Sequence, residues 1–233
     1  MLSNTIQAVI VDLDGTMVDT MGDFCLALNR MLADHALPPV PRSFVERTVG
    51  KGSEHLIHST LEYVQKQAES HINNAQAATK KIAHEDAWQA YQSYYLAVNG
   101  QASAVYEGVV QGLELLQSRG FKLACLTNKP TAFALPLLKL KGLDVYFSHV
   151  FGGDAFERKK PDPLPLLKTC QALGTLPAHT LMVGDSSNDA VAAHTAGCPV
   201  VLVTYGYNHG KPIRNVAANA YVDSLVQLGA LLG

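Results

Sequence analysis

The chain has 233 residues, enough for one large domain or for one domain that carries an insert. Hydrophobic residues make up 48% of it and can supply a sizeable core, while 18 Lys and Arg against 20 Asp and Glu give a net charge of −2. This balance excludes the basic surface typical of nucleic-acid-binding proteins and the acidic tail of a disordered chain.

The cysteines and the N-terminus favour a cytoplasmic protein. The chain has four cysteines, none of which forms a C-x-x-C pair with another, and each has small apolar neighbours: Cys25, Cys125, Cys170 and Cys198. We therefore expect reduced, buried cysteines and no zinc site. The first seven residues lack the regions of a signal peptide, and no apolar run approaches the roughly 20 residues of a membrane span. Neither a membrane nor nucleic acid is expected as a partner.

The first predicted element is a buried strand at Ala8 to Val11, a short β-branched run. From about Asp19 to Gly100 strand signals vanish and apolar residues recur at helical spacing, with a break at Pro38–Pro41. Within this stretch, residues 65–87 are rich in polar residues and are predicted to be solvated helix faces.

From Val105 onward predicted strands and helices alternate. Strands are expected at 122–126, 149–151, 181–183, 200–203 and 221–222. Helices are expected at 109–119, from Pro130 as first helical residue, after 160–163, and at 190–196. This alternation is typical of an α/β fold with a doubly wound, mostly parallel, Rossmann-like sheet. The core then comprises residues 1–18 and 105–233, and residues 19–104 form an inserted all-helical domain.

Polar side chains follow several predicted strands, where ligands bind in such sheets. They are Asp12, Asp14, Thr127, Asn128, Lys129, Lys160, Asp185 and Asp189. Carboxylate oxygens suit Mg²⁺, and a carboxylate can also act as a nucleophile. A second carboxyl two positions on can serve as general acid and base, and lysine can offset the charge of a phosphate. These residue types predict phosphoryl transfer.

Each signal alone has an ordinary structural explanation. Asp12 or Thr127 could cap a helix, Lys160 could be a solvated lysine, and the segment from Asp185 to Asp189 is a plausible capping sequence. Four such signals in order at strand ends favour a functional site over a set of unrelated structural residues.

The same residues resemble a known family. Asp12-Leu13-Asp14-Gly15-Thr16, Thr127-Asn128, Lys160-Pro161-x-Pro163 and Gly184-Asp185-Ser186-Ser187-Asn188-Asp189 resemble, in this order, the four motifs of the haloacid dehalogenase superfamily. The helical insert is similar to the C1-type cap of that superfamily.

The resemblance implies a role for each matched residue. Asp12 would be the nucleophile and Asp14 the general acid and base, while Lys160 would steady the nucleophile and the phosphate. Thr127, with Gly15 and Asn128, would bind the phosphate. Mg²⁺ would be held by Asp12, the backbone carbonyl of Asp14, and Asp185. Asp189 would be a secondary acidic residue near the metal or Lys160.

Further detail resembles bacterial phosphoglycolate phosphatases, in the segments Asp12 to Asp19, Thr127 to Thr131, Gly152-Gly153-Asp154, Lys159 to Pro163 and Thr204 to Asn208. This resemblance implies hydrolysis of 2-phosphoglycolate, a small phosphorylated metabolite, through an aspartyl-phosphate. Lys51, in Gly50-Lys51-Gly52, or Arg42 or Arg47, would meet the substrate carboxylate from the cap; the alternative for all three is a solvated charge. Three other functions stay open: hydrolysis of another phosphate ester or pyrophosphate, a sugar-phosphate mutase, and a silent binder of phosphate ligands. Both a monomer and a homodimer are compatible with the sequence.

Overall fold

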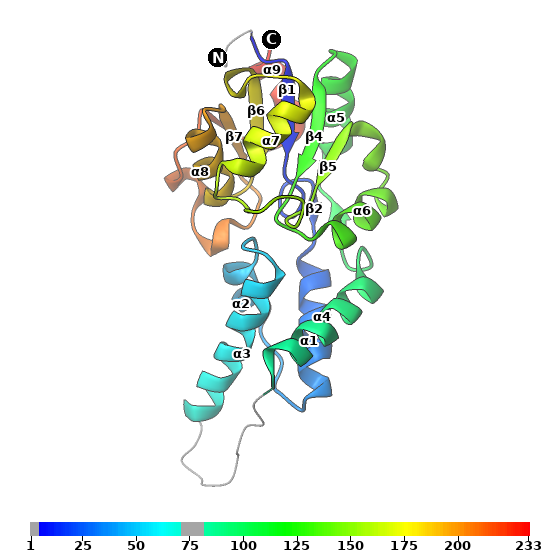
Figure 1. The fold of residues 1–233 in the computed structure, drawn as a ribbon, viewed down its shortest axis with the longest axis vertical. Coiled ribbons are helices and arrows are strands. Elements are labelled where there is room, and N and C mark those ends of the chain that lie inside the picture. The colour runs from blue at the N-terminus through cyan, green and yellow to red at the C-terminus, as the bar shows by residue number, and fades with distance from the viewer. Residues whose placement is uncertain (1–4, 71–81) are drawn as a thin grey trace.

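The computed structural model describes residues 5–70 and 82–233 of the chain. Within them, six strands form one sheet in the order β5-β4-β1-β6-β7-β8, and every pair of neighbours is parallel (Figure 1). The strands are β1 (Ala8–Val11), β4 (Lys122–Leu126), β5 (His149–Phe151), β6 (Thr180–Gly184), β7 (Val200–Val203) and β8 (Ala220–Val222). Helices alternate with these strands, which confirms the predicted doubly wound α/β fold.

The central strand β1 determines where the functional residues meet. All four of its residues are apolar and buried, as expected for a strand covered on both faces. Val11 pairs with Cys125 of β4 on one side and with Val183 of β6 on the other. The three central strands therefore end side by side, and the residues that follow them come to one edge of the sheet.

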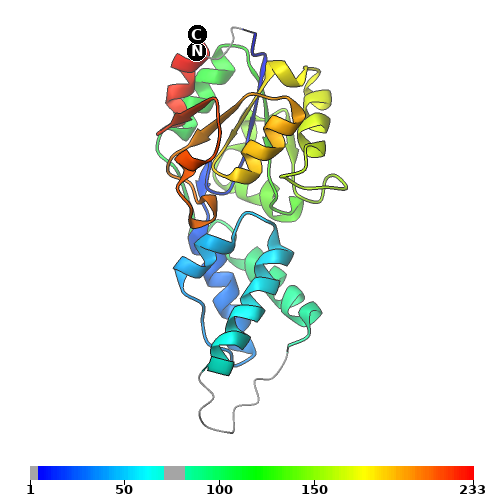
Figure 2. The ribbon, with the colours of Figure 1, turned by 90° about the vertical axis from the view of Figure 1, so that its left-hand side faces the viewer.

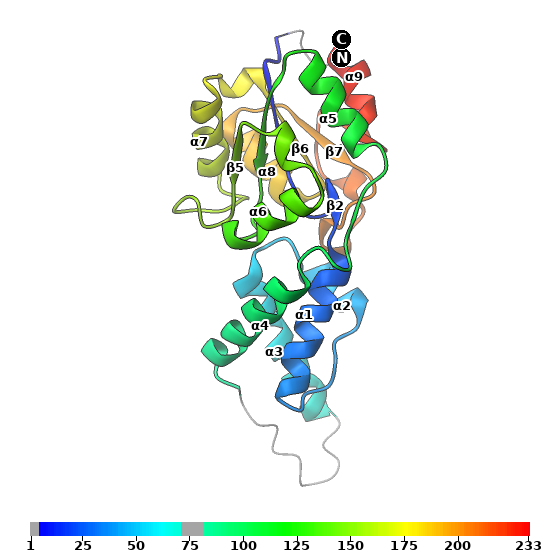
Figure 3. The ribbon, with the colours of Figure 1, turned by 90° about the vertical axis from the view of Figure 1, so that its right-hand side faces the viewer.

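Helices cover both faces of the sheet (Figure 3). They are α5 (Val109–Ser118), α6 (Thr131–Leu140), α7 (Leu164–Leu173), α8 (Ser187–Ala196) and α9 (Leu228–Leu231). Val9 and Val11 pack with residues of α5, α6 and α9, while Ala8 and Ile10 pack with residues of α7 and α8. Successive residues of β1 thus contribute to opposite cores, because side chains alternate along a strand.

A separate group of helices lies beyond the edge at which the strands end (Figures 1 and 2). It comprises α1 (Met21–Asp34), α2 (Arg42–Thr48), α3 (Ser53–Ser70) and α4 (His84–Val98). These helices share a hydrophobic cluster of their own, which includes Leu28, Ile57 and Tyr91 and is joined by Phe133 of α6. The antiparallel pair β2 (Val18–Asp19) and β3 (Ala104–Val105) lies where the chain leaves the sheet and returns to it.

Several predicted boundaries need correction. Helix α8 begins at Ser187 and not at Ala190, because Ser186 and Asp189 form a capping box that starts the helix earlier. Pro130 is the residue before α6 and not its first helical residue. Of the predicted solvated stretch 65–87, residues 71–81 lie outside the described part. Among the described helices, none is long and apolar enough to span a bilayer.

Candidate active site

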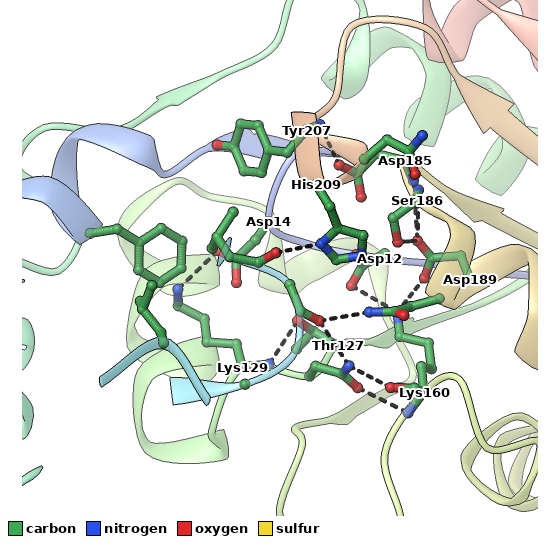
Figure 4. A pocket seen from close by; sticks show the side chains of 18 of the residues that line it. Asp12, Asp14, Thr127, Lys129, Lys160, Asp185, Ser186, Asp189, Tyr207 and His209 are labelled. Atoms are coloured by element: carbon green, nitrogen blue, oxygen red, sulfur yellow. Dashed lines mark hydrogen bonds and ion pairs between the residues drawn. The ribbon is translucent and has the colours of Figure 1, made fainter. Parts of the chain in front are cut away.

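A pocket lies at the edge of the sheet where the strands end, with α1 and α3 contributing to its wall (Figure 4). All eight polar residues expected after the predicted strands line it together: Asp12, Asp14, Thr127, Asn128, Lys129, Lys160, Asp185 and Asp189. Gly15 and Lys51, also predicted, are not among the lining residues.

The acidic residues Asp12, Asp185 and Asp189 offer oxygens that all lie within 4.8 Å of one another, and all three residues are buried. Burial, opposed by the nearby charge of Lys160, raises the pKa of Asp12 to about 7. The pKa of Asp185 is raised well above its ordinary value by burial and then by repulsion from Asp189 and Asp12. A cluster of this kind keeps its negative charge only if a cation compensates it.

Lys160 supplies part of that compensation. Its Nζ lies 3.0 Å from Asp12 Oδ1 and donates to Asp189 Oδ1 at 2.7 Å and to the carbonyl of Leu126 at 2.8 Å. The backbone of Lys160 is held on both sides by the side chain of Asn128, which accepts from its N–H and donates to its carbonyl. The ammonium is therefore fixed beside the expected nucleophile.

Asp189 is more fully engaged than its neighbours. One oxygen accepts from Lys160, and the other accepts from the N–H of Asp185 and from both the N–H and the hydroxyl of Ser186. The sequence placed Asp189 near the metal or near Lys160, and the hydrogen bond to Lys160 is present. Both oxygens of Asp189 therefore have partners. Its hydrogen bonds with Ser186 form the capping box that begins α8.

Asp14 lies on the side of the pocket that faces the helical group. Its Oδ1 accepts from the hydroxyl of Thr20 at 2.8 Å and from Nζ of Lys129 at 2.9 Å. The sequence assigned no role to Lys129, although it directly follows Thr127 and Asn128. A lone lysine at a strand end is usually solvated, whereas this side chain is only 1% exposed. Its position next to a motif was the one available signal.

The expected phosphate donors are only partly as predicted. The N–H of Gly15 donates to the carbonyl of Val18, so this N–H is already engaged. Gly15 instead allows a close approach: its φ is +82°, and a Cβ would lie 2.4 Å from Asp185 Oδ2. The side chain of Asn128 is engaged by Gly50 and Lys160, which leaves its backbone N–H. The Thr127 hydroxyl accepts from the N–H of Lys129 and retains its own proton to donate.

The residues predicted to meet the substrate from the cap do not line the pocket in this structure. Lys51 is exposed and outside the pocket, and its neighbours Gly50, Gly52 and Ser53 line the wall instead. Arg42 pairs with Glu46 and Asp19 at the surface. Neither Arg42 nor Arg47 lines the pocket.

Two residues that the sequence did not single out, Asn188 and His209, bind the loop that precedes α3. The Asn188 amide donates to the carbonyl of Gly50 at 3.1 Å, and Nδ1 of His209 lies 2.9 Å from the carbonyl of Val49. No sequence motif indicates these contacts, since they join segments that are more than 130 residues apart.

The residues present fit a divalent metal ion. Asp12 Oδ1 is buried and forms an ion pair at 3.0 Å with Nζ of Lys160, whose geometric hydrogen bonds go to Asp189 and Leu126. Asp185 contributes a second buried carboxylate, one oxygen of which accepts from the N–H of Tyr207. Hard divalent cations such as Mg²⁺ prefer oxygen ligands of this kind.

Comparisons with known proteins agree with this geometry. The profile of the haloacid dehalogenase-like hydrolases matches residues 9–203. A Cupriavidus necator protein named phosphoglycolate phosphatase, plasmid, is 40% identical over 225 residues, which cover 97% of this chain and 92% of that protein. A Thiobacillus denitrificans protein named phosphoglycolate phosphatase is 36% identical over 227 residues, with 97% and 96% covered.

A solved structure is similar over the whole chain as well. It is described as a predicted phosphoglycolate phosphatase from Haemophilus somnus, is 33% identical, and has a TM-score of 0.91 with 98% of this chain and 99% of its own covered. With the profile match over most of the chain and full-length relatives at this identity, this chain belongs to the haloacid dehalogenase-like hydrolase family.

Proposed function

We propose that this protein is a Mg²⁺-dependent phosphomonoesterase that hydrolyses 2-phosphoglycolate to glycolate and phosphate. The observation that carries the reaction type is the pair Asp12 and Asp14 at the end of β1, each beside a buried lysine in one pocket. The substrate is supported by the names of the relatives that align over nearly the whole chain.

In the first half of the reaction, a carboxylate oxygen of Asp12 attacks phosphorus, and the bond between phosphorus and the ester oxygen breaks. Asp14 gives its proton to that oxygen, so the leaving group departs as a neutral alcohol and not as an alkoxide. In the second half, Asp14 takes a proton from water, whose oxygen attacks the aspartyl-phosphate. The bond from phosphorus to Asp12 then breaks, which restores the carboxylate.

Several donors of this chain are placed to hold the phosphoryl oxygens. The Thr127 hydroxyl has a free proton, and the backbone N–H groups of Leu13, Asp14 and Asn128 have no hydrogen-bond partner in the described ranges. The ammonium of Lys160 lies beside the nucleophile and reduces its repulsion of the phosphate. Fixed donors of this kind stabilise the charge of the transition state with little reorganisation.

A divalent ion would be held by Asp12, Asp185 and the backbone carbonyl of Asp14. When bound, it would supply positive charge that reduces the repulsion between the nucleophile and the phosphate. Asp189 would assist indirectly, since it fixes Lys160 and the backbone of Asp185.

Residues 19–104 are proposed to act as a cap over this site. Phe24 and Leu56 of the helical group line the same pocket as the catalytic residues, together with Phe133 of α6. These apolar side chains leave space for a small organic group and exclude bulk water from the reaction, a usual role of a lid.

Phosphate release from a panel of phosphate esters tests the proposal. The panel contains 2-phosphoglycolate, sugar phosphates, nucleotides and pyrophosphate, each with and without Mg²⁺. We expect Mg²⁺-dependent release that prefers phosphoglycolate and falls to background in Asp12→Asn. Release from another ester would keep the chemistry and change the substrate. No release from any ester by the folded protein would contradict the proposal and favour a mutase or a silent binder.

A further inference from the structure

Lys129 occupies an unusual position for a lysine. Its side chain is 1% exposed, and its Nζ lies 2.9 Å from Asp14 Oδ1. The ammonium also donates to the hydroxyl of Tyr95 and lies 4.7 Å from the ring centre of Phe24 and 4.6 Å from that of Tyr95. Lys129 belongs to the loop after β4, whereas Phe24 and Tyr95 belong to the helical group.

Burial of an ammonium is costly, so a buried lysine at a pocket calls for a reason. Lys160 already provides a cation beside Asp12 and Asp189. Among the described residues that line the pocket, Lys129 and Lys160 are the only lysines, and no arginine lines it. Lys129 is therefore the second permanent positive charge of the site, and it lies on the side of Asp14.

The proposed reaction places the organic part of the substrate on that side. Asp14 must reach the ester oxygen to protonate it, so that oxygen lies within hydrogen-bond distance of the Asp14 carboxyl. In 2-phosphoglycolate a single CH₂ group joins the ester oxygen to the carboxylate. The carboxylate is therefore confined to the surroundings of Asp14, where Lys129 lies 2.9 Å away.

The hydrogen bonds of Lys129 leave room for such a ligand. An ammonium has three N–H groups, and Asp14 and Tyr95 account for two of them. The aromatic rings of Phe24 and Tyr95 limit access of water to the ammonium, which strengthens its attraction for an anion.

We propose that Lys129 binds the carboxylate of the substrate and so selects phosphate monoesters of short 2-hydroxy carboxylic acids. Phe24 and Tyr95 hold the ammonium in place from the helical group, so carboxylate recognition requires that group to lie over the sheet. The inference rests on the proposed function, and it assigns to Lys129 the contact that the sequence had suggested for Lys51.

A comparison of two substrates tests this role. Ethyl phosphate has the same two-carbon skeleton as 2-phosphoglycolate, with a methyl group in place of the carboxylate. We expect Lys129→Met to lower the ratio of kcat/KM for phosphoglycolate to kcat/KM for ethyl phosphate by about 10- to 100-fold, since hydrogen bonds to charged groups contribute about 1.5–3 kcal/mol. The ratio is informative because a general effect of the substitution on Asp14 lowers kcat/KM for both substrates by the same factor, which cancels in the ratio.

Two outcomes would overturn the inference. If Lys129 only positions Asp14, both kcat/KM values fall together and the ratio stays unchanged. If Lys51→Met lowers the ratio and Lys129→Met does not, the carboxylate is bound from the cap loop. The matched control is Lys168→Met, which removes an exposed ammonium from α7 and should leave both rates unchanged.

A second variant covers the case in which Lys129→Met does not fold, as judged by circular dichroism. Tyr95→Phe keeps the ammonium and the ring but removes one hydrogen-bond partner of Lys129. We expect it to change the same ratio by a few-fold, and an unchanged ratio in this variant would then overturn the inference.

The wild-type protein distinguishes a failure of the Lys129 role from a failure of the proposed function. Hydrolysis of ethyl phosphate with no preference for phosphoglycolate would overturn the role of Lys129 and keep the phosphatase chemistry, whereas no hydrolysis of either would contradict the proposed function.

Discussion

At the scale of single residues, Asp14 is distinguished by the unequal surroundings of its two oxygens. Oδ1 accepts from Thr20 and Lys129, while Oδ2 has no hydrogen-bond partner in the part of the chain that the structure describes. A carboxyl held by one oxygen presents the other in a fixed direction, as a proton donor requires. The contrast with Asp189, whose oxygens are both engaged, supports different roles for the two residues.

Replacement of Asp14 by Asn tests its role as acid and base. We expect kcat for phosphoglycolate to fall by about 10²–10⁴-fold, because the alkoxide then leaves without a proton. A nitrophenyl ester needs no such proton, so Asp14→Asn should still form the aspartyl-phosphate from it. Stopped-flow measurement should show a rapid release of about one equivalent of nitrophenol, followed by slow turnover because the base is missing. Equal losses with both esters and no initial burst would contradict this assignment.

The buried carboxyls Asp12 and Asp185 predict a pH-dependent response to metal. Burial raises the pKa of Asp12 to about 7 and that of Asp185 well above its ordinary value, whereas an unfolded Asp titrates near 3.8. Between about pH 4 and 7 the metal-free folded state therefore binds more protons than the unfolded chain. The contribution of these two carboxyls to the free energy of unfolding of the metal-free protein therefore falls as the pH rises through this window.

Thermal unfolding with and without Mg²⁺ measures this effect. Protons compete with the metal for Asp12 at pH 5.5, whereas at pH 8, above the pKa of about 7 of this carboxyl, they compete less. We expect the Mg²⁺-induced rise in Tm to be larger at pH 8 than at pH 5.5, by several degrees. Asp185→Asn should reduce the rise at both pH values. An equal rise at both pH values in the wild-type protein would contradict the assignment of these residues as ligands.

At the scale of elements, Asp23 joins the first and last parts of the helical group. This residue is fully buried in α1, and its oxygens accept from the N–H of Gly100 at 2.8 Å and of Ala102 at 2.7 Å. Because backbone N–H groups in a buried place need partners, the carboxylate fixes the segment after α4 against α1.

We expect Asp23→Ala to lower the free energy of unfolding by about 2–4 kcal/mol, since it removes two hydrogen bonds to a charged group. Asp34→Ala is the matched control in the same helix. Asp34 is exposed and accepts from the Tyr94 hydroxyl, so its loss should cost less than about 1 kcal/mol. Urea denaturation followed by circular dichroism gives both values, and similar losses in the two variants would show that the Asp23 contacts contribute little.

Elements with strong local signals were predictable from the sequence. The strands at 122–126, 149–151 and 200–203 have the predicted bounds, because each is a short and mostly apolar stretch with glycine, proline or a polar residue close to its ends. The start of α8 was missed since it depends on a capping box rather than on apolar spacing. Ordered motifs at strand ends likewise predicted the charged and polar residues at the base of the pocket, although not its apolar wall. Lys129 and His209 could not be assigned, because their partners come from distant segments of the chain.

At the scale of the whole molecule, three side chains of the sheet layers bind one loop of the helical group. Asn128 and Asn188 both donate to the carbonyl of Gly50, and His209 contacts the carbonyl of Val49. Their attachment points lie after β4, in α8 and after β7. The loop therefore closes the pocket over all three strand ends, and each hydrogen bond stabilises this closed arrangement.

Removal of one of these contacts should open the pocket without altering its preference among substrates. A neutral hydrogen bond contributes about 0.5–1.5 kcal/mol, so in Asn188→Ala we expect amide exchange in residues 49–56 to be faster by about 2- to 10-fold. The kcat/KM values for phosphoglycolate and ethyl phosphate should fall by a common factor, unlike the selective change expected for Lys129→Met. Asn219→Ala is the matched control, since Asn219 accepts from the N–H of Val200 within the sheet. Unchanged exchange in residues 49–56 of Asn188→Ala would mean that the other contacts hold the loop without Asn188.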